Sequence, residues 1–246
     1  MFGLGRRVFG LAAIALGLIG LVFADFAAVW QPVPKDLPRY TDLAYGAAAA
    51  QIVAGLALQW RRTAGAGALL LAALYSVFAF YWAQRVAGFA EIFGTWSGFA
   101  EQVALVAAAL VAFAIALPPA SSAARGLAQI GRLIFGLCLI AFGAAHFLYM
   151  KETATMVPDW MPPGRQEWAL VTGVLLVMAG LALLADIAAL VAAQLLTVMF
   201  AAFGLLVWGP QILGHPESHL VWAGNAINLA LMGAAWVMTD AIAARA

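Results

Sequence analysis

Long apolar runs recur along the whole chain, separated by short polar segments. Each run has about 17 to 23 residues, the length that an α-helix needs to cross the hydrocarbon core of a bilayer. The runs are continuous, whereas strands of a transmembrane barrel alternate apolar and polar residues over about 10 positions. The pattern predicts eight membrane-spanning helices, which are Val8–Trp30, Asp42–Trp60, Gly65–Trp82, Phe99–Leu117, Ile130–Met150, Trp168–Leu184, Ile187–Gly209 and His219–Thr239.

The composition supports an all-α integral membrane protein. Hydrophobic residues make up 66% of the 246 residues and charged residues only 9%, too few charges to cover the surface of a soluble domain. A net charge of +1 argues against a nucleic-acid partner, for which a basic patch is expected. The lone cysteine, Cys138, excludes an intrachain disulfide. Redox chemistry would therefore need a bound cofactor, a metal or a protein redox partner.

The two halves of the chain repeat the same landmarks in the same order. At offsets of 124 to 126 residues, the pairs are GRRVFGL (5–11) with GRLIFGL (131–137), VPKDLP (33–38) with VPDWMP (157–162), and IVAGLAL (52–58) with VMAGLAL (177–183). We therefore expect two four-helix copies, residues 1–124 and residues 125–246. The repeat also favours a structural helix over a signal peptide at the N-terminus.

Four spans per copy is an even number, so the two copies are expected to be parallel repeats with both termini on one side of the membrane. The side that holds the termini carries Arg6, Arg7, Arg61, Arg62, Arg125, Arg132 and Arg245, and we call it the arginine-rich end. The opposite side, the acid-rich end, carries Asp25, Asp36, Asp42, Glu91, Glu101, Glu152, Asp159, Glu167 and Glu217. The positive-inside rule then predicts cytoplasmic termini and fits a bacterial inner-membrane protein.

The acid-rich end also collects all three histidines and seven of the nine tryptophans. A simple aromatic belt would place tryptophan at both membrane interfaces. The asymmetry therefore favours a pocket at the acid-rich end, and the alternative is that longer loops there have more room for tryptophan.

The most distinctive segment, Phe142–Gly173, reads FGAAHFLYMKETATMVPDWMPPGRQEWALVTG. Together with the helix opening GRLIFGL and the final helix GNAINLALMGA, it resembles the DoxX-like family of four-helix membrane proteins over most of residues 131–240. The first copy departs from this pattern, because Val22 stands where the second copy has His146. The resemblance implies a four-helix bundle and, through the membrane subunit of thiosulfate:quinone oxidoreductase, quinone-linked redox work. A remoter likeness to sterol-isomerase and lipid-receptor bundles implies a sterol or isoprenoid lipid instead.

Four ionisable residues are candidates for moving protons in such a reaction. His146 lies about one turn inside the end of an apolar helix, where an unpaired polar group is costly. Glu101 lies inside a predicted span, while Asp159 and Glu167 flank the proline-rich loop. A structural hydrogen bond for His146 and solvated loop charges for Asp159 and Glu167 are the alternatives.

A second group of side chains is expected to bind the substrate. Glu101 and Asn225 match at an offset of 124 residues. Glu101 with Gln102, and Asn225 with Asn228, are predicted to form paired polar rungs that face the pocket or the interface between the repeats. The aromatic residues predicted to line a flat apolar slot for a quinone or lipid include Trp160, Tyr149, Trp168 and Trp222. Packing and lipid contact are the alternative for these aromatic residues.

A metal site is a weaker alternative. The sequence HPESH puts His215 and His219 four residues apart, and His146 could join them. No cysteine or second spaced pair supports this reading.

Three functions remain open at this point. The chain could be a quinone-linked redox component, a lipid-binding protein or lipid isomerase, or an assembly factor without chemistry of its own. In each case membrane lipid surrounds it.

Overall fold

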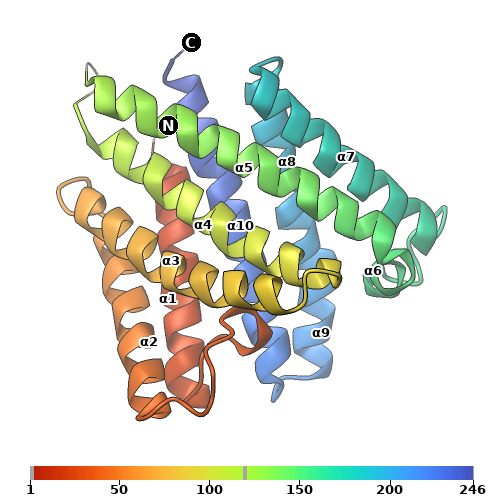
Figure 1. The fold of residues 1–246 in the computed structure, drawn as a ribbon. Helices are drawn as coiled ribbons and strands as arrows, with labels where there is room; N and C mark the ends of the chain where they lie inside the picture. Colours follow the sequence, from red (N-terminus) through yellow and green to blue (C-terminus); the bar gives the residue numbers. More distant parts are fainter. Residues whose placement is uncertain (1–2, 119–120, 246) are drawn as a thin grey trace.

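The computed structural model describes residues 3–118 and 121–245, and within them every regular element is helical (Figure 1). The long helices are α1 (Leu4–Phe23), α2 (Tyr40–Ala57), α3 (Ala64–Gly88), α4 (Phe93–Ala116), α5 (Ser122–Leu148), α7 (Arg165–Ala185), α8 (Ala189–Phe203) and α10 (His219–Ala243). The short elements are η1 (Ala28–Trp30), α6 (Met150–Met156), the π-helical segment η2 (Gly204–Trp208) and α9 (Gly209–Gly214). The expectation of an all-helical fold is confirmed.

In the part of the chain that the structure describes, seven helices are long and apolar enough to cross a membrane. They are α1, α3, α4, α5, α7, α10 and the continuous rod of α8, η2 and α9. The eighth long helix, α2, is not in this set and carries Asp42 and Gln51. The predicted first span is too long at its end, because Ala24 adopts a left-handed backbone with φ 52° and α1 stops at Phe23.

The first two helices of each copy cross where glycines let the backbones meet. A β-carbon placed on Gly10 of α1 would lie 2.6 Å from the carbonyl oxygen of Gly55 on α2. One placed on Gly180 of α7 would lie 2.6 Å from the carbonyl oxygen of Gly136 on α5. These small residues allow close helix packing, as expected for helices without a large side chain at the contact.

The arginine in the opening motif of each copy has the same partner. Arg6 on α1 donates a hydrogen bond to the carbonyl oxygen of Leu58, just after α2. Arg132 on α5 donates to the carbonyl oxygen of Leu183 near the end of α7 and also pairs with Asp186 at 3.0 Å. Both arginines are buried, and each satisfies a carbonyl that the end of a helix leaves without an intrahelical partner.

The fourth helices of the two copies, α4 and α10, also make equivalent contacts. The Trp96 indole donates to the carbonyl oxygen of Ala90 at 3.0 Å, and the Trp222 indole donates to that of Pro216 at 2.8 Å. The two contacts are related by an offset of 126 residues, which fixes the alignment of α4 with α10.

The two copies exchange helix contacts and do not form separate bundles. The first helix of each copy packs on the fourth helix of the other, so α1 lies against α10 and α5 lies against α4. Both contacts are tight, because β-carbons on Gly5 and Gly131 would collide with α10 and α4. Helices α4 and α10 also contact each other at the centre. The predicted boundary at residues 124 and 125 falls inside the first turn of α5, which begins at Ser122.

The start of α1 and the end of α10 lie at one end of the bundle, and α9 and the loop after α1 lie at the other (Figure 1). The connecting loops at the acid-rich end differ between the copies. Phe26, Gln31 and Val33 in the first loop are buried, whereas Met156 and Trp160 in the corresponding second loop are exposed.

Candidate functional site

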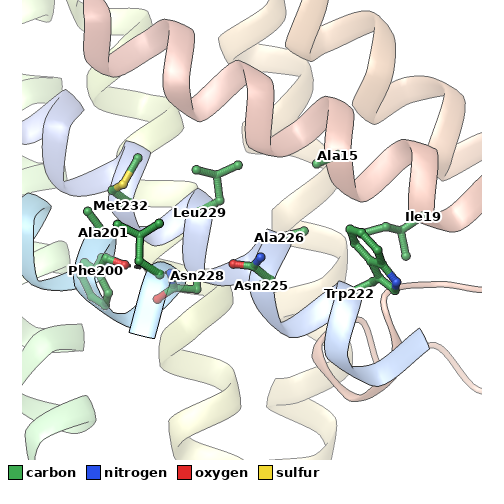
Figure 2. Close-up of a pocket in the computed structure, with 12 residues that line it drawn as sticks. Ala15, Ile19, Phe200, Ala201, Trp222, Asn225, Ala226, Asn228, Leu229 and Met232 are labelled. Atoms are coloured by element: carbon green, nitrogen blue, oxygen red, sulfur yellow. Dashed lines mark hydrogen bonds between the residues drawn. The ribbon is translucent and has the colours of Figure 1, made fainter. Parts of the chain in front are cut away.

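A groove with a cavity volume of about 510 Å³ runs along α10, with α1 on one side and the rod of α8 and η2 on the other. Ala15 and Ile19 form the α1 wall, and Phe200 and Leu205 belong to the opposite wall. Figure 2 shows Trp222 beside Ile19 at one end of the groove and the two asparagines between Trp222 and Met232. Leu205 is 76% exposed, so the groove lies at the side of the bundle.

The π-helical segment η2 shapes one wall of the groove. Its widened turn is closed by a hydrogen bond from the Gly209 amide to the Gly204 carbonyl. The buried Asn228 amide nitrogen donates to the carbonyl oxygen of Phe200 at 2.9 Å and ties α10 to the end of α8. A β-carbon on Gly204 would lie 3.1 Å from the Asn228 amide nitrogen and 3.6 Å from the Asn225 amide oxygen. Glycine thus leaves room for the Asn228 amide, whereas the distance to Asn225 is an ordinary van der Waals contact. Single π-helical turns often occur at functional sites.

Asn225 is the polar group of the groove that has no partner. Its side chain is half-buried, and it makes no hydrogen bond to any residue within 3–118 and 121–245. Removing an amide from water without a compensating hydrogen bond costs roughly 1–3 kcal/mol in proteins. The fold leaves Asn225 half-buried, so this cost applies where the groove faces lipid, and the amide is free to bond to a ligand.

The first copy has a matching groove without the amide. It has a volume of about 230 Å³ and is lined by α3, α4 and α5. At the offset of 126 residues, Phe99 and Val103 occupy the positions of Asn225 and Leu229. The second copy thus has the larger groove and has an asparagine where the first has phenylalanine.

A stacked pair of rings joins α1 to α10 at the acid-rich end. Phe23 at the end of α1 and His219 at the start of α10 lie with ring centroids 4.5 Å apart and planes at 16°. The His219 Nε2 atom is buried and has no hydrogen-bond partner among the residues that the structure describes.

A charged cluster lies just beyond this end. Asp25 accepts hydrogen bonds from the Tyr40 hydroxyl, from Lys35 Nζ at 3.2 Å and from the Phe26 amide at 2.8 Å. Burial raises the pKa of the Asp25 carboxyl, but the hydrogen bonds outweigh burial and hold that pKa below its ordinary value.

His146 lies outside the groove, at the crossing of α5 and α7. Its Nδ1 atom is 2.8 Å from the Phe142 carbonyl oxygen, so Nδ1 carries the proton and donates. A β-carbon on Gly173 would lie 2.8 Å from the His146 β-carbon, so glycine makes room for the imidazole. The glycine contacts of α1 and α5 are related by 126 residues, and this offset makes Gly20 the counterpart of His146. The expected correspondence with Val22 is therefore wrong by two residues.

The predicted loop residues have local partners. Asp159 pairs with Arg165 at 2.6 Å, and the Trp168 indole donates to the carbonyl oxygen of Pro162 at 2.9 Å. Trp160 is 68% exposed, and Glu167 at the start of α7 is also exposed.

Tyr149 links α5 to the first turn of α4, because its hydroxyl accepts a hydrogen bond from the Gly94 amide at 2.9 Å. Neither Tyr149 nor the predicted loop residues line the groove.

Glu101 lies on α4, half-buried, beside the Trp30 indole. The neighbouring Gln102 is fully buried and donates from Nε2 to the Trp30 carbonyl oxygen at 3.0 Å. The same oxygen accepts a hydrogen bond from the Trp82 indole at 3.1 Å. This buried polar cluster joins α3 and α4 to η1 and is separate from the groove.

The expected pairing of Glu101 with Asn225 needs correction. At the offset of 126 residues that the tryptophan contacts define, Glu101 corresponds to Ile227 and Gln102 corresponds to Asn228. Gln102 and Asn228 both donate to a backbone carbonyl of another element. The matching polar rungs are therefore Gln102 and Asn228, and Asn225 has no polar counterpart.

The three histidines have separate neighbours. His215 lies 3.9 Å from Glu217 in the exposed loop, His219 stacks on Phe23, and His146 bonds to α5 itself. Across the described ranges, no group of three or more His, Cys, Asp or Glu side chains is arranged to hold a metal ion.

The sequence interpretation thus named Trp222, Asn225 and Asn228 in the groove and missed Gly204 and the α1 wall. The sequence carries no signal for Gly204, because this glycine meets Asn228 only through the packing of η2 against α10.

Comparisons with known proteins add one family match. A family model described as a domain of unknown function, DUF8561, matches residues 135–207. This range covers most of α5, α7, α8 and much of η2, so it includes His146 and one wall of the groove but not α10. No curated protein and no solved structure matches the chain.

Proposed function

We propose that this chain is an integral membrane protein that binds a lipid-like molecule from the bilayer in the groove along α10. The observation that carries the proposal is the combination of apolar walls, a volume of about 510 Å³ and an unpartnered amide at the side of the bundle. Ligand sites are commonly apolar pockets with a few polar groups that orient the ligand. Molecules dissolved in the membrane could enter such a groove sideways without passing through water.

The membrane assignment is supported by seven long apolar helices and by the large apolar side chains they leave exposed, such as Leu195, Val198 and Met178. We propose that α2 also crosses the membrane, which gives eight spans in two parallel four-helix repeats. The charge division between the two ends supports cytoplasmic termini and a bacterial inner-membrane location. Membership of the DoxX-like family remains part of this proposal.

A binding function fits the arrangement better than acid-base catalysis at the groove. General acid-base catalysis needs a titratable group within hydrogen-bond reach of the reacting atom. The groove is lined by neutral residues, and neither His146 nor Glu101 belongs to its lining.

A quinone-linked redox role is the second candidate, because the lining of the groove includes both an indole, Trp222, and an amide, Asn225. A planar ring could lie against the indole while the amide donates to a ring carbonyl. Electrons would then have to come from a protein redox partner. Extraction of bound quinone from the purified protein tests this role, and the absence of quinone together with the presence of another lipid would refute it.

The binding proposal is tested by filling the groove. Ala201 and Ala83 are half-buried alanines that line the second and the first groove. We expect mass spectrometry of the protein purified in mild detergent to find a retained lipid in the wild type and in Ala83→Phe but much less in Ala201→Phe. Equal retention in both variants, at equal thermal stability, would contradict the proposal.

The proposed orientation has its own test. In a Cys138→Ser background, a membrane-impermeant maleimide should label Glu217→Cys in intact spheroplasts and label Arg61→Cys only after permeabilisation. The reverse labelling pattern would overturn the assigned orientation.

A further inference from the structure

The unpartnered amide of Asn225 gives information about what the groove binds. Its counterpart Phe99 fills the smaller groove of the first copy. An asparagine that replaces such a filler in an apolar wall is costly unless something hydrogen-bonds to it. Among the described residues of the groove, Asn228 bonds to Phe200, and no hydrogen bond joins a lining residue to Asn225.

The position of Asn225 along α10 fixes the depth of this polar group. Asn225 lies six residues and Asn228 nine residues after His219, the first residue of α10. At a rise of 1.5 Å per residue, they lie about 9 Å and about 13 Å from the start of a helix that is about 37 Å long. A helix of that length centred on a hydrocarbon core of about 30 Å extends about 4 Å beyond the core at each end, so Asn225 and Asn228 lie about 5 Å and about 10 Å inside it.

Depth and charge restrict the chemistry of the ligand. A diacyl phospholipid keeps its polar atoms near the membrane interface and would bring only hydrocarbon to this level. A charged ligand group is disfavoured, because no charged side chain lines the groove and an unpaired charge in hydrocarbon is costly. A neutral oxygen, in a hydroxyl or a carbonyl, is complementary to an amide that both donates and accepts.

We propose that the groove selects a neutral lipid with a hydroxyl or carbonyl oxygen within its hydrocarbon body, and that Asn225 is the residue that determines this specificity. The inference rests on the proposed binding function and adds the chemical class of the ligand.

Three photoreactive probes test the inference. They share one long chain and one diazirine and differ only at mid-chain, which carries a hydroxyl, a ketone or a plain methylene. The full-length protein in nanodiscs is irradiated with each probe, and labelling of peptides from 200–205 and 222–232 is measured. We expect at least one oxygenated probe to label about threefold or more above the methylene probe, the average that a hydrogen bond within a membrane contributes.

Variants of Asn225 test whether its amide causes the preference for an oxygenated probe. Asn225→Leu should lower labelling by the oxygenated probe to the level of the methylene probe, and Asn225→Ala provides a second variant that leaves space. Phe99→Leu, at the equivalent position of the other groove, should leave the preference unchanged. Comparison of the hydroxyl and ketone probes then identifies which oxygen the amide pairs with.

The outcomes separate the two proposals. If all three probes labelled the groove of the wild-type protein equally, the proposed class of ligand would be refuted, but the proposed lipid binding would stand. A preference that persists in both Asn225 variants would overturn the role of Asn225. Absence of labelling in the groove by every probe would overturn the binding function as well.

Discussion

The crossing of α5 and α7 offers a sharp test of the close helix contacts. A β-carbon on Gly143 of α5 would lie 2.7 Å from the carbonyl oxygen of Gly173 and 3.1 Å from the amide nitrogen of Val177, both on α7. Neither backbone atom can move without its helix, so Gly143→Ala should force the helices apart. Overpacking of this kind typically costs about 1–3 kcal/mol, and the better helix propensity of alanine returns up to about 1 kcal/mol.

The net loss of roughly 1–2 kcal/mol corresponds to a melting temperature lower by roughly 2–8 °C for a chain of this size. Gly126 on the same helix is the matched control, because a β-carbon there meets nothing within 4 Å. Gly126→Ala should leave the melting temperature unchanged or raise it. The buried thiol of Cys138, the single cysteine, reports unfolding through a thiol-reactive fluorescent dye. Equal melting temperatures for the two variants would refute the close crossing.

Three further outcomes are expected. Arg132→Met should lower the melting temperature by several degrees, because a carbonyl at the end of α7 loses its buried donor, whereas Arg165→Met, which breaks an exposed ion pair, should change it little. Burial raises the pKa of Asp25, but its hydrogen bonds outweigh burial and hold that pKa below its ordinary value. The carboxylate therefore stabilises the fold above a pH of about 4, and this stabilisation is lost as the pH falls further. Asp25→Asn should flatten this acid-side decline in a pH series of melting curves. Fragments 1–118 and 121–246 should copurify when expressed together and be degraded or aggregate when expressed singly, and stable single fragments would contradict the exchange of helices between the copies.

The helices and the two copies were predictable because their signals are local. Run length and apolarity predict a long helix directly, and repeated motifs such as GRRVFGL and GRLIFGL reveal the duplication. The end of α1 was missed, because the apolar pattern continues past Phe23 while the backbone turns at Ala24. Hydrophobicity does not encode that turn.

The candidate site was predicted in part for the same reason. Trp222, Asn225 and Asn228 follow one another at three-residue spacing on one helix, so their shared face can be read from the sequence. His146 and Glu101 lie on other helices, and their relation to Asn225 depends on how the copies pack. The exchange of α1 and α5 between the copies has no signature in either copy alone. The register of 126 residues between α4 and α10 likewise became clear only from the tryptophan contacts.

The contact between α1 and α10 has a consequence for how the protein is made. Asp240 accepts hydrogen bonds from the Gly3 and Gly5 amides, and the second of these bonds spans 235 residues of sequence. At a synthesis rate of about 5–20 residues per second, the first helix waits roughly 10 to 50 s before its partner leaves the ribosome. During that interval the face of α1 around Gly5, which later packs against α10, has no partner, whereas Gly10 and Gly17 already pack against α2. If the chain spans a membrane as proposed, correct assembly therefore requires that this face of the oldest helix stays unoccupied until the newest helix arrives.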